Sequence, residues 1–280
     1  VHGGLSLQGN TDGQRWSAVG EIDLDSAIWQ GVQLTQVRGP ILMDQSGVRF
    51  GAMTVSDGMT PRRLSAKVAG GKIEVDGMAS SSGLGGFTVA ASLVDADLER
   101  LACDSHGAPH SSKGRVFGSV EISGTRAGTH SLRGHGQMRI RDADVYELPL
   151  VVAMLKMLRV KSPDRNAFGS SFIQFRIAGP HAYLDEIELA GDAISLVGNG
   201  EVGFDGDVQM TFRSIMGDAE EQLPAMKRML GGASGQFLLL HVDGSLGSPE
   251  LSTEAFPTLA AAIQKLQSQR QEKTRPRRTA

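Results

Sequence analysis

Apolar and polar residues alternate in short segments along most of this chain. In residues 134–141 one alternate set is Gly134, Gly136, Met138 and Ile140, and the other set is polar. Successive side chains of a β-strand point to opposite faces, so this pattern predicts a strand with one apolar face. Similar segments recur at short spacing with glycine-rich turns between them, which predicts an antiparallel meander. They lie around residues 18–25, 48–53, 72–76, 87–93, 116–122, 173–177 and 186–189.

The segment 194–212 predicts a hairpin whose register can be worked out. Two apolar sets, each on alternate residues, flank an Asp-Gly-Asp turn at 205–207. A two-residue turn would put the two sets on opposite faces, whereas a three-residue loop that pairs Phe204 with Val208 aligns them. Because register follows the apolar face, we predict the three-residue loop with a bulge. The residues expected to line the apolar face of the sheet are Met138, Ile140, Ile194, Leu196, Val202, Phe204, Val208, Met210 and Phe212.

Three segments follow a helical pattern. Residues 148–160 are apolar nearly all round and end before a Ser-Pro pair, and residues 218–230 have Asp218 as N-cap and a Gly-Gly stop. A third helix is expected after Thr253, because apolar residues follow at helical spacing from Phe256 onward. Three short helices cannot cover so large a sheet. The apolar face must therefore be covered by the sheet folding on itself or by a ligand.

The helix expected at 148–160 would either pack against the sheet or lie on a membrane surface. An interfacial helix needs a polar face, and only Lys156, Arg159 and Lys161 would supply one. Packing across the sheet is therefore the favoured interpretation. The covering residues would be Leu150, Met154, Leu155 and Leu158.

Composition and charge narrow the class of protein. The chain has 280 residues, 36 glycines and only 5% aromatic residues, and its net charge of −3 gives no general attraction to nucleic acid. Residues 265–280 carry six basic residues and one acidic residue, and this polar tail is expected to be disordered. The tail could bind anionic lipid headgroups or serve only as a solubilising end.

The chain divides into three parts: a strand ladder over 1–113, a strand region with two helices over 114–252, and a helix with a basic tail over 253–280. Its one cysteine, Cys103, allows no intrachain disulfide, which suits the cytosol and the periplasm equally. No run approaches the roughly 20 apolar residues that span a bilayer. The first residue is Val1, so we expect a C-terminal part of a longer protein, or a processed form, with a signal or anchor helix upstream.

Two motifs have a chemical interpretation and a simpler structural one. Residues 198–203 match the G-x-G-x-x-G dinucleotide fingerprint, but they lie inside one expected strand instead of between a strand and a helix. Cys103, His106 and His110 have a spacing seen in metal sites, although serines, a glycine and a proline surround them as in a surface loop. We favour the surface loop and predict no metal and no cofactor.

The acidic triplets at 95–97 and 142–144 could be taken for catalytic carboxylate pairs. The more ordinary role of aspartate at such places is to end a strand and cap the next turn or helix. The G-x-S-x-G elbow of a serine hydrolase is absent, and no convergent set of polar residues replaces it. We therefore expect that the protein is not an enzyme.

The order of segments in the C-terminal part is similar to that of a known family. Residues 134–150 read as a strand that passes through an Asp-Ala-Asp triplet into an apolar helix. Residues 244–251 read G-S-L-G-S-P-E-L, which matches the pattern G-[ST]-L-x-x-P-x-L. Over about 114–252 the chain resembles the C-terminal region of AsmA-like proteins, and over 1–113 the ladder and the acidic triplet support the resemblance. The later strands that share the family's order are expected at 172–177, 187–189, 196–204 and 238–242.

The resemblance implies a protein of the bacterial envelope. AsmA-like proteins are typically anchored in the inner membrane by an N-terminal helix, lie mostly in the periplasm, and form a long, curved, taco-like antiparallel groove lined with aliphatic side chains. The implied role is bridge-like transport of phospholipid toward the outer membrane, or outer-membrane assembly. For this chain it implies phospholipid or another acyl-chain lipid as partner, membrane attachment through a segment upstream, and further envelope proteins as partners. The family carries over no catalytic residue.

A second hypothesis, from a different class, is a structural or protein-binding β-sandwich or β-solenoid of the envelope. Calcium-type or strict short repeats would support it, and the sequence has neither. The leading hypothesis is a non-enzymatic lipid conduit with an all-β fold. It would be a long curved antiparallel sheet with two or three short helices, whose apolar side chains replace bilayer contacts for acyl tails.

Overall fold

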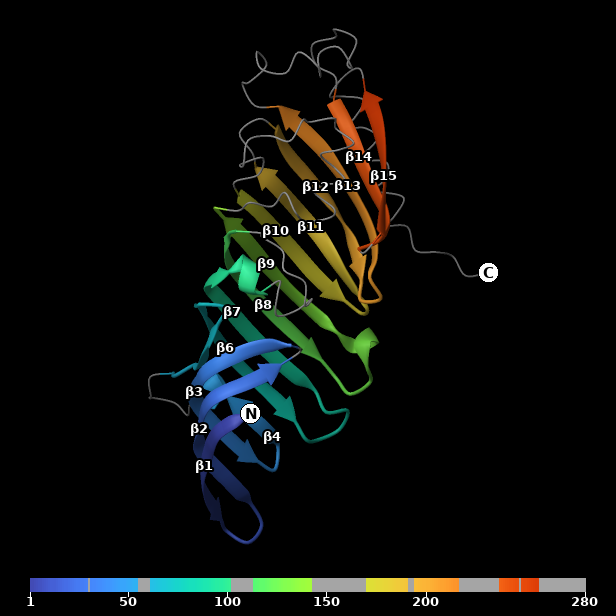
Figure 1. The fold of residues 1–280 in the computed structure, drawn as a ribbon. Coiled ribbons are helices and arrows are strands. Elements are labelled where there is room, and N and C mark those ends of the chain that lie inside the picture. Colours follow the sequence, from blue (N-terminus) through green and yellow to red (C-terminus); the bar gives the residue numbers. More distant parts are fainter. Residues whose placement is uncertain are drawn as a thin grey trace, which may run out of the picture.

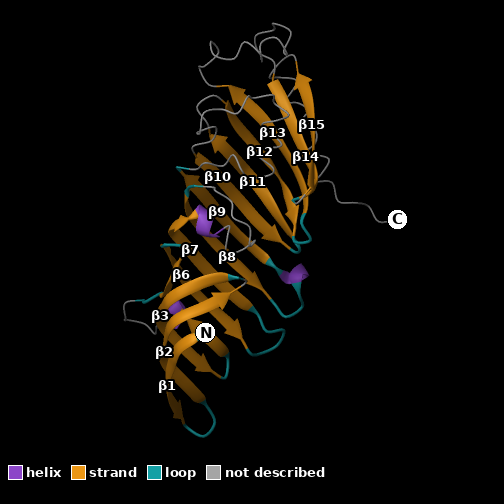
Figure 2. Ribbon diagram, viewed as in Figure 1, coloured by secondary structure: helices purple, strands orange, loops and turns teal. Residues whose placement is uncertain are grey.

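Fifteen strands pair antiparallel into one sheet that contains almost all of the described chain. The computed structural model describes residues 1–29, 31–54, 61–101, 113–142, 170–190, 194–216, 237–246 and 248–256. Figure 2 shows that strands dominate this part of the chain and that its helical segments are short turns. The predicted all-β class and the antiparallel meander are confirmed.

The strands follow the alternating segments of the sequence. The first eight are β1 (His2–Thr11), β2 (Trp16–Trp29), β3 (Val32–Asp44), β4 (Gly47–Phe50), β5 (Leu64–Val68), β6 (Gly71–Ser80), β7 (Phe87–Asp97) and β8 (Arg115–Gly124). The remaining seven are β9 (Arg133–Arg141), β10 (Ser170–Ala178), β11 (His181–Ala190), β12 (Ile194–Gly203), β13 (Asp207–Met216), β14 (Phe237–Ser245) and β15 (Ser248–Phe256). Two 3-10 turns, η1 (Gly51–Thr54) and η2 (Thr129–Ser131), lie between strands.

Nearly every strand lies beside its neighbours in sequence. The exception is β5, which pairs with β3 and β6 next to the short strand β4. The pairing of β7 with β8 joins residues 1–113 to residues 114–252 without a break in the sheet. Figure 1 shows the strands stacked obliquely along one axis, with β1 at one end and β15 at the other, in a curved and twisted sheet. Within the described residues, no second sheet packs on either face.

The predicted helices fall mostly outside the described residues. This applies to 148–160, with its covering residues Leu150, Met154, Leu155 and Leu158, and to 218–230. The third helix was expected to follow Thr253, but β15 continues to Phe256, and the rest of that expected helix lies outside the described residues. The register explains this correction, because Thr253 and Phe256 are opposite Leu240 and Phe237 of β14 and extend the antiparallel ladder.

The hairpin of β12 and β13 has the predicted loop length but a different register. Val208 pairs with Val202, and the three-residue loop is 204–206. Gly206 has φ 97 at the third loop position, which is where a three-residue hairpin loop needs a residue with positive φ. Phe204 therefore lies in the turn, 51% exposed, and the expectation that it lines the apolar face is wrong. The apolar sets of the two strands still share one face, as predicted.

Candidate functional site: the apolar face of the sheet

Register partners of neighbouring strands lie on the same face of a sheet, so the pairing shows which residues share a face. A row that crosses the sheet from β6 to β15 contains no charged or polar side chain. The rows on either side of it, which begin at Ile73 and Gly77, also contain no charged side chain. We call this side the apolar face. The central row is Val75, Ala91, Val120, Gly136, Phe175, Leu184, Gly200, Met210, Val242 and Leu251.

Seven of the nine residues expected to line this surface lie on the apolar face. They come from β9, β12 and β13, and the register aligns them. Of the other two, Phe204 lies in the turn, and Ile194 is the first residue of β12 and pairs with Met216. The seven are Met138, Ile140, Leu196, Val202, Val208, Met210 and Phe212. Whether they contact a lipid stays a prediction.

Glycines on the apolar face are paired with large side chains. A Cβ added to Gly198 would lie 2.5 Å from Cδ1 of Phe212, and one added to Gly136 would lie 2.5 Å from Cζ of Phe175. The rings therefore lie over the glycines, and each pair fills the space of two medium-sized residues. Phe50 with Gly77 and Phe87 with Gly124 repeat this arrangement. Such glycines make room for the large side chains opposite them.

Glycines of the apolar face also mark places where the backbones of neighbouring strands come close together. A Cβ on Gly134, Gly136 or Gly198 would lie 2.5 Å from a carbonyl oxygen of the neighbouring strand, and a similar clash arises at Gly20 and Gly200. Glycine within a strand commonly marks a bend or a close approach of backbones. At all five glycines the added Cβ would lie on the apolar face. At these five positions the apolar face therefore has no room for a Cβ.

The apolar face differs in burial along its length. Leu196, Phe212 and Val242 are at most 2% exposed and belong to a cluster of buried residues that reaches Ala96 on β7. Met138, Leu184 and Val202 pack against this cluster but are only partly buried. Toward β6, the residues of the central row are half-buried. The half-buried part offers apolar surface to a ligand, and the buried cluster stabilises the sheet.

The opposite face is polar, and several of its charged groups are paired with one another. Arg176 donates two hydrogen bonds to the Asp185 carboxylate, at 2.6 and 2.8 Å. Arg115 Nε donates to Asp95 Oδ1 at 2.7 Å, and this hydrogen bond lowers the pKa of Asp95. Arg176 also lies over the ring of Tyr183, with 5.6 Å from Cζ to the ring centroid. The contrast between the two faces is that of a sheet with one side toward water and one toward apolar groups.

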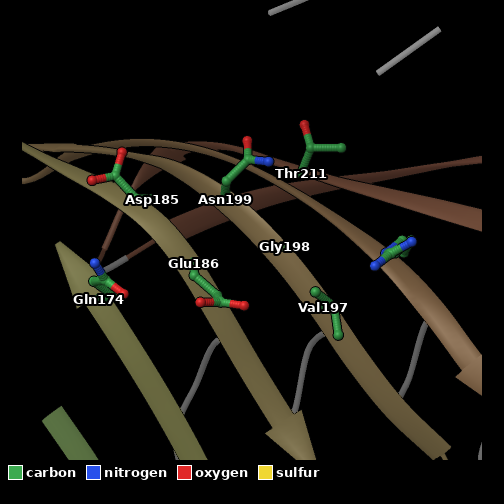
Figure 3. A pocket seen from close by; sticks show the side chains of 8 residues that line it. Gln174, Asp185, Glu186, Val197, Gly198, Asn199 and Thr211 are labelled. Atoms are coloured by element: carbon green, nitrogen blue, oxygen red, sulfur yellow. The ribbon is translucent and has the colours of Figure 1, made fainter. Parts of the chain in front are cut away.

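A shallow hollow of about 430 Å³ lies on the polar face over β10–β13 (Figure 3). The register shifts between Leu184 and Ile187, so that Asp185 and Glu186 both lie opposite Asn199. Asp185 is already bound to Arg176. Among the described residues, no group of three or more His, Cys, Asp or Glu side chains could hold a metal ion. The hollow results from this bulge, which has no signature in the sequence. The side chains that line it are Gln174, Asp185, Glu186, Val197, Asn199, Thr211 and Arg213.

The remaining candidates from the sequence either have a structural role, in a turn, a cap or a strand, or lie outside the described residues. Asp95 and Asp142, the first residues of the two acidic triplets, both have positive φ, of 59 and 51. Asp97 Oδ1 accepts the backbone N–H of Arg100 at 3.1 Å, as a capping residue does. Residues 198–203 lie within β12, as expected for a strand and not for a nucleotide loop. Cys103, His106 and His110 lie outside the described residues.

Comparisons of the chain with protein-family models, with curated proteins and with solved structures give no match. Among the described residues, no helix has the length and apolar character needed to cross a membrane. The apolar face is therefore the main guide to function.

Proposed function

We propose that the apolar face binds phospholipid acyl chains and forms a path along which they move between the two membranes of a bacterial envelope. The observation that supports this most directly is the row from Val75 to Leu251, which crosses ten strands without a polar side chain. At about 4.8 Å per strand this row is roughly 43 Å long. The resemblance of 114–252 to AsmA-like proteins supports the same role, a periplasmic location and the absence of catalysis.

The energetics suit a lipid that is held and yet can move. Each buried methylene contributes roughly 0.8 kcal/mol, so about a dozen carbons contribute on the order of 10 kcal/mol before the cost of ordering the chain. Along the row, both glycines lie beside a large residue, Gly136 beside Phe175 and Gly200 beside Met210. A chain that moves by one strand spacing thus exchanges one set of apolar contacts for a similar one.

Two adjacent alanines of β7 provide a matched test. Ala91 lies on the apolar face opposite Val75 and Val120, and Ala90 lies on the polar face opposite Asp76 and Glu121. Both are partly exposed. With the photocrosslinker p-benzoylphenylalanine at one position or the other, we expect phospholipid adducts by mass spectrometry from position 91 and few from position 90. Equal labelling at both positions would exclude the apolar face as the binding surface.

A charge at the same two positions tests transport. Ala91→Lys puts an ammonium group among Val75 and Val120, whereas Ala90→Lys puts it beside Asp76 and Glu121, which can pair with it. We expect the first variant to lower fluorescent-phospholipid transfer between vesicles at least fivefold and the second to leave it unchanged. Transfer that is unaffected by Ala91→Lys, in a protein with unchanged circular dichroism, would refute the proposed path.

A further inference from the structure

The polar face has few basic side chains over β11–β15, the C-terminal end of the sheet in Figure 1. Every ion pair within the described residues takes its basic partner from residues 2–176. Among the described residues of β11–β15, Arg213 is the one Lys or Arg. Seven carboxylates share this part of the polar face, and within the described chain one of them, Asp185, has an ion pair, with Arg176 of β10. We call the seven the acidic patch: Asp185, Glu186, Glu188, Glu201, Asp207, Asp243 and Glu250.

The register of the sheet brings carboxylates of the acidic patch together. Asp243 pairs with Glu250 across β14 and β15, and both side chains are exposed. At the bulge of β11, Asp185 and Glu186 both lie opposite Asn199. Like charges directly opposite each other destabilise a sheet, and a cation placed between them offsets this repulsion. The acidic patch therefore favours a partner with several positive charges.

The chain has a segment of this kind in its basic tail, residues 265–280. The net charge of the whole chain is −3 and the basic tail contributes +5, so the rest of the chain carries −8. The acidic patch together with Arg213 accounts for −6 of this excess. A segment tethered to the same chain also has a high effective concentration at the patch, which a separate molecule does not have.

The connection between the sheet and the basic tail is long enough for this contact. Strand β15 ends at Phe256, and Lys265 follows nine residues later, which spans up to about 30 Å in an extended chain. From β15 to β11 the acidic patch is four strand spacings wide, or about 19 Å. An extended chain places alternate residues on one side, so Lys273 and Arg275 can both face the patch.

We infer that the basic tail docks on the acidic patch of its own chain and covers the polar face over β11–β15. The docked tail places positive charge beside Asp243 and Glu250, where the like charges are opposite each other. It also withholds its basic groups from anionic surfaces, so that the acidic patch and an anionic membrane compete for the same segment. The inference concerns the polar face and holds whether or not the apolar face binds lipid.

Zero-length cross-linking tests the contact in the full chain. A carbodiimide joins a lysine ammonium group to a carboxylate that it touches, and the basic tail contains Lys265 and Lys273. At low salt we expect cross-links from these lysines to the acidic patch at least fivefold above those to Glu99 and Glu121, which are exposed and lie outside it. Because exposed charges are screened by salt, the cross-links should fall at least fivefold in about 0.5 M NaCl.

Two outcomes of this experiment would overturn the inference. Equal cross-linking to the acidic patch and to Glu99 and Glu121 would show that the basic tail has no preferred site. A mixture of isotopically light and heavy chains identifies the chain that supplies the tail. Cross-links that mainly join a light peptide to a heavy one would show that the tail belongs to a second copy.

A charge reversal on the sheet provides a variant with a matched control. Asp243→Lys combined with Glu250→Lys removes the opposed carboxylates, and we expect it to lower cross-linking of the basic tail to the rest of the patch at least fivefold. Glu99→Lys combined with Glu121→Lys makes the same change in net charge outside the patch and should leave the cross-links unchanged. Equal effects of the two double variants would refute docking at the patch.

A compensating reversal in the basic tail completes the test. Lys273→Glu, Arg275→Glu and Arg277→Glu are added to the chain that carries lysines at positions 243 and 250. We expect the contact to return, with cross-links that now join the introduced lysines of the sheet to the introduced glutamates of the tail. Absence of this rescue, in a protein whose circular dichroism matches that of the wild type, would overturn the inference.

Discussion

Replacing Gly198 by alanine tests whether the apolar face needs a glycine at this position. The new Cβ would lie 2.5 Å from Cδ1 of Phe212 and 2.5 Å from the carbonyl oxygen of Thr211. Phe212 is only 2% exposed, so its ring has little room to move, and the backbone of β13 would have to shift. Overpacking of this kind typically costs about 1–3 kcal/mol. We expect Gly198→Ala to lower the free energy of unfolding by this amount.

The control is a strand glycine on the polar face. Gly4 of β1 has nothing within 4 Å of an added Cβ, so Gly4→Ala should leave stability unchanged or raise it by a few tenths of a kcal/mol. Thermal denaturation followed by circular dichroism measures both variants. For a chain of this size, 1–3 kcal/mol corresponds to a fall in Tm of about 2–5 °C. Equal Tm values for Gly198→Ala and Gly4→Ala would refute the close packing inferred at Gly198.

A double-mutant cycle separates the two clashes. Phe212→Leu removes the ring that contacts position 198 but leaves the carbonyl of Thr211 in place. If the ring is the main obstacle, Gly198→Ala should cost less in the Phe212→Leu background than in the wild type, with a coupling energy of about 0.5–3 kcal/mol. If the backbone is the main obstacle, the two costs should add.

Three further predictions concern stability. Gly206→Ala should cost about 1–2 kcal/mol in urea denaturation, because φ 97 is strained for alanine, and an unchanged midpoint would contradict the assigned loop. Asp76→Ala should cost about 1–3 kcal/mol, since Asp76 is 7% exposed and accepts the N–H of Ala52 at 2.7 Å; a neutral effect would show that water replaces it. The hydrogen bond from Lys72 lowers the pKa of Glu74 below its ordinary value of 4.5, so its stabilisation is complete above that pH and is lost as pH falls through the lowered pKa. Tm measured against pH should fall less steeply below pH 4.5 in Lys72→Met than in the wild type.

The sequence predicted the strands better than their register. Alternation at 134–141 and 173–177 identified β9 and β10, because a period of two is a local property of the chain. The loop at 204–206 was misplaced, since the apolar pattern allows pairings that differ by two residues and both put the same side chains on one face. The positive φ of Gly206 decides between them. The glycine could have been used for this purpose from the sequence.

Other features depend on contacts that the sequence does not display. The bulge at Asp185 and Glu186 forms where β10 and β12 flank β11, and it produces the polar hollow. The pairing of glycines with phenylalanines becomes visible only when the register of neighbouring strands is known, as for Gly136 and Phe175. At the start of the third expected helix, the pairing of Thr253 and Phe256 with β14 shows that residues 253–256 continue the ladder, which depends on a partner strand that the local helical spacing does not reveal.

The neighbour-only pairing of the strands has a consequence for how such a protein can change in length. Apart from the β3–β6 region, each strand depends on the strand before it and the strand after it, so the sheet is nearly one-dimensional. Gain or loss of a whole hairpin would alter the reach of the molecule by roughly 10 Å and leave distant strands undisturbed. The number of hairpins then sets the length of the sheet. Duplication or deletion of hairpins could fit this length to the width of a gap without changes in the rest of the fold.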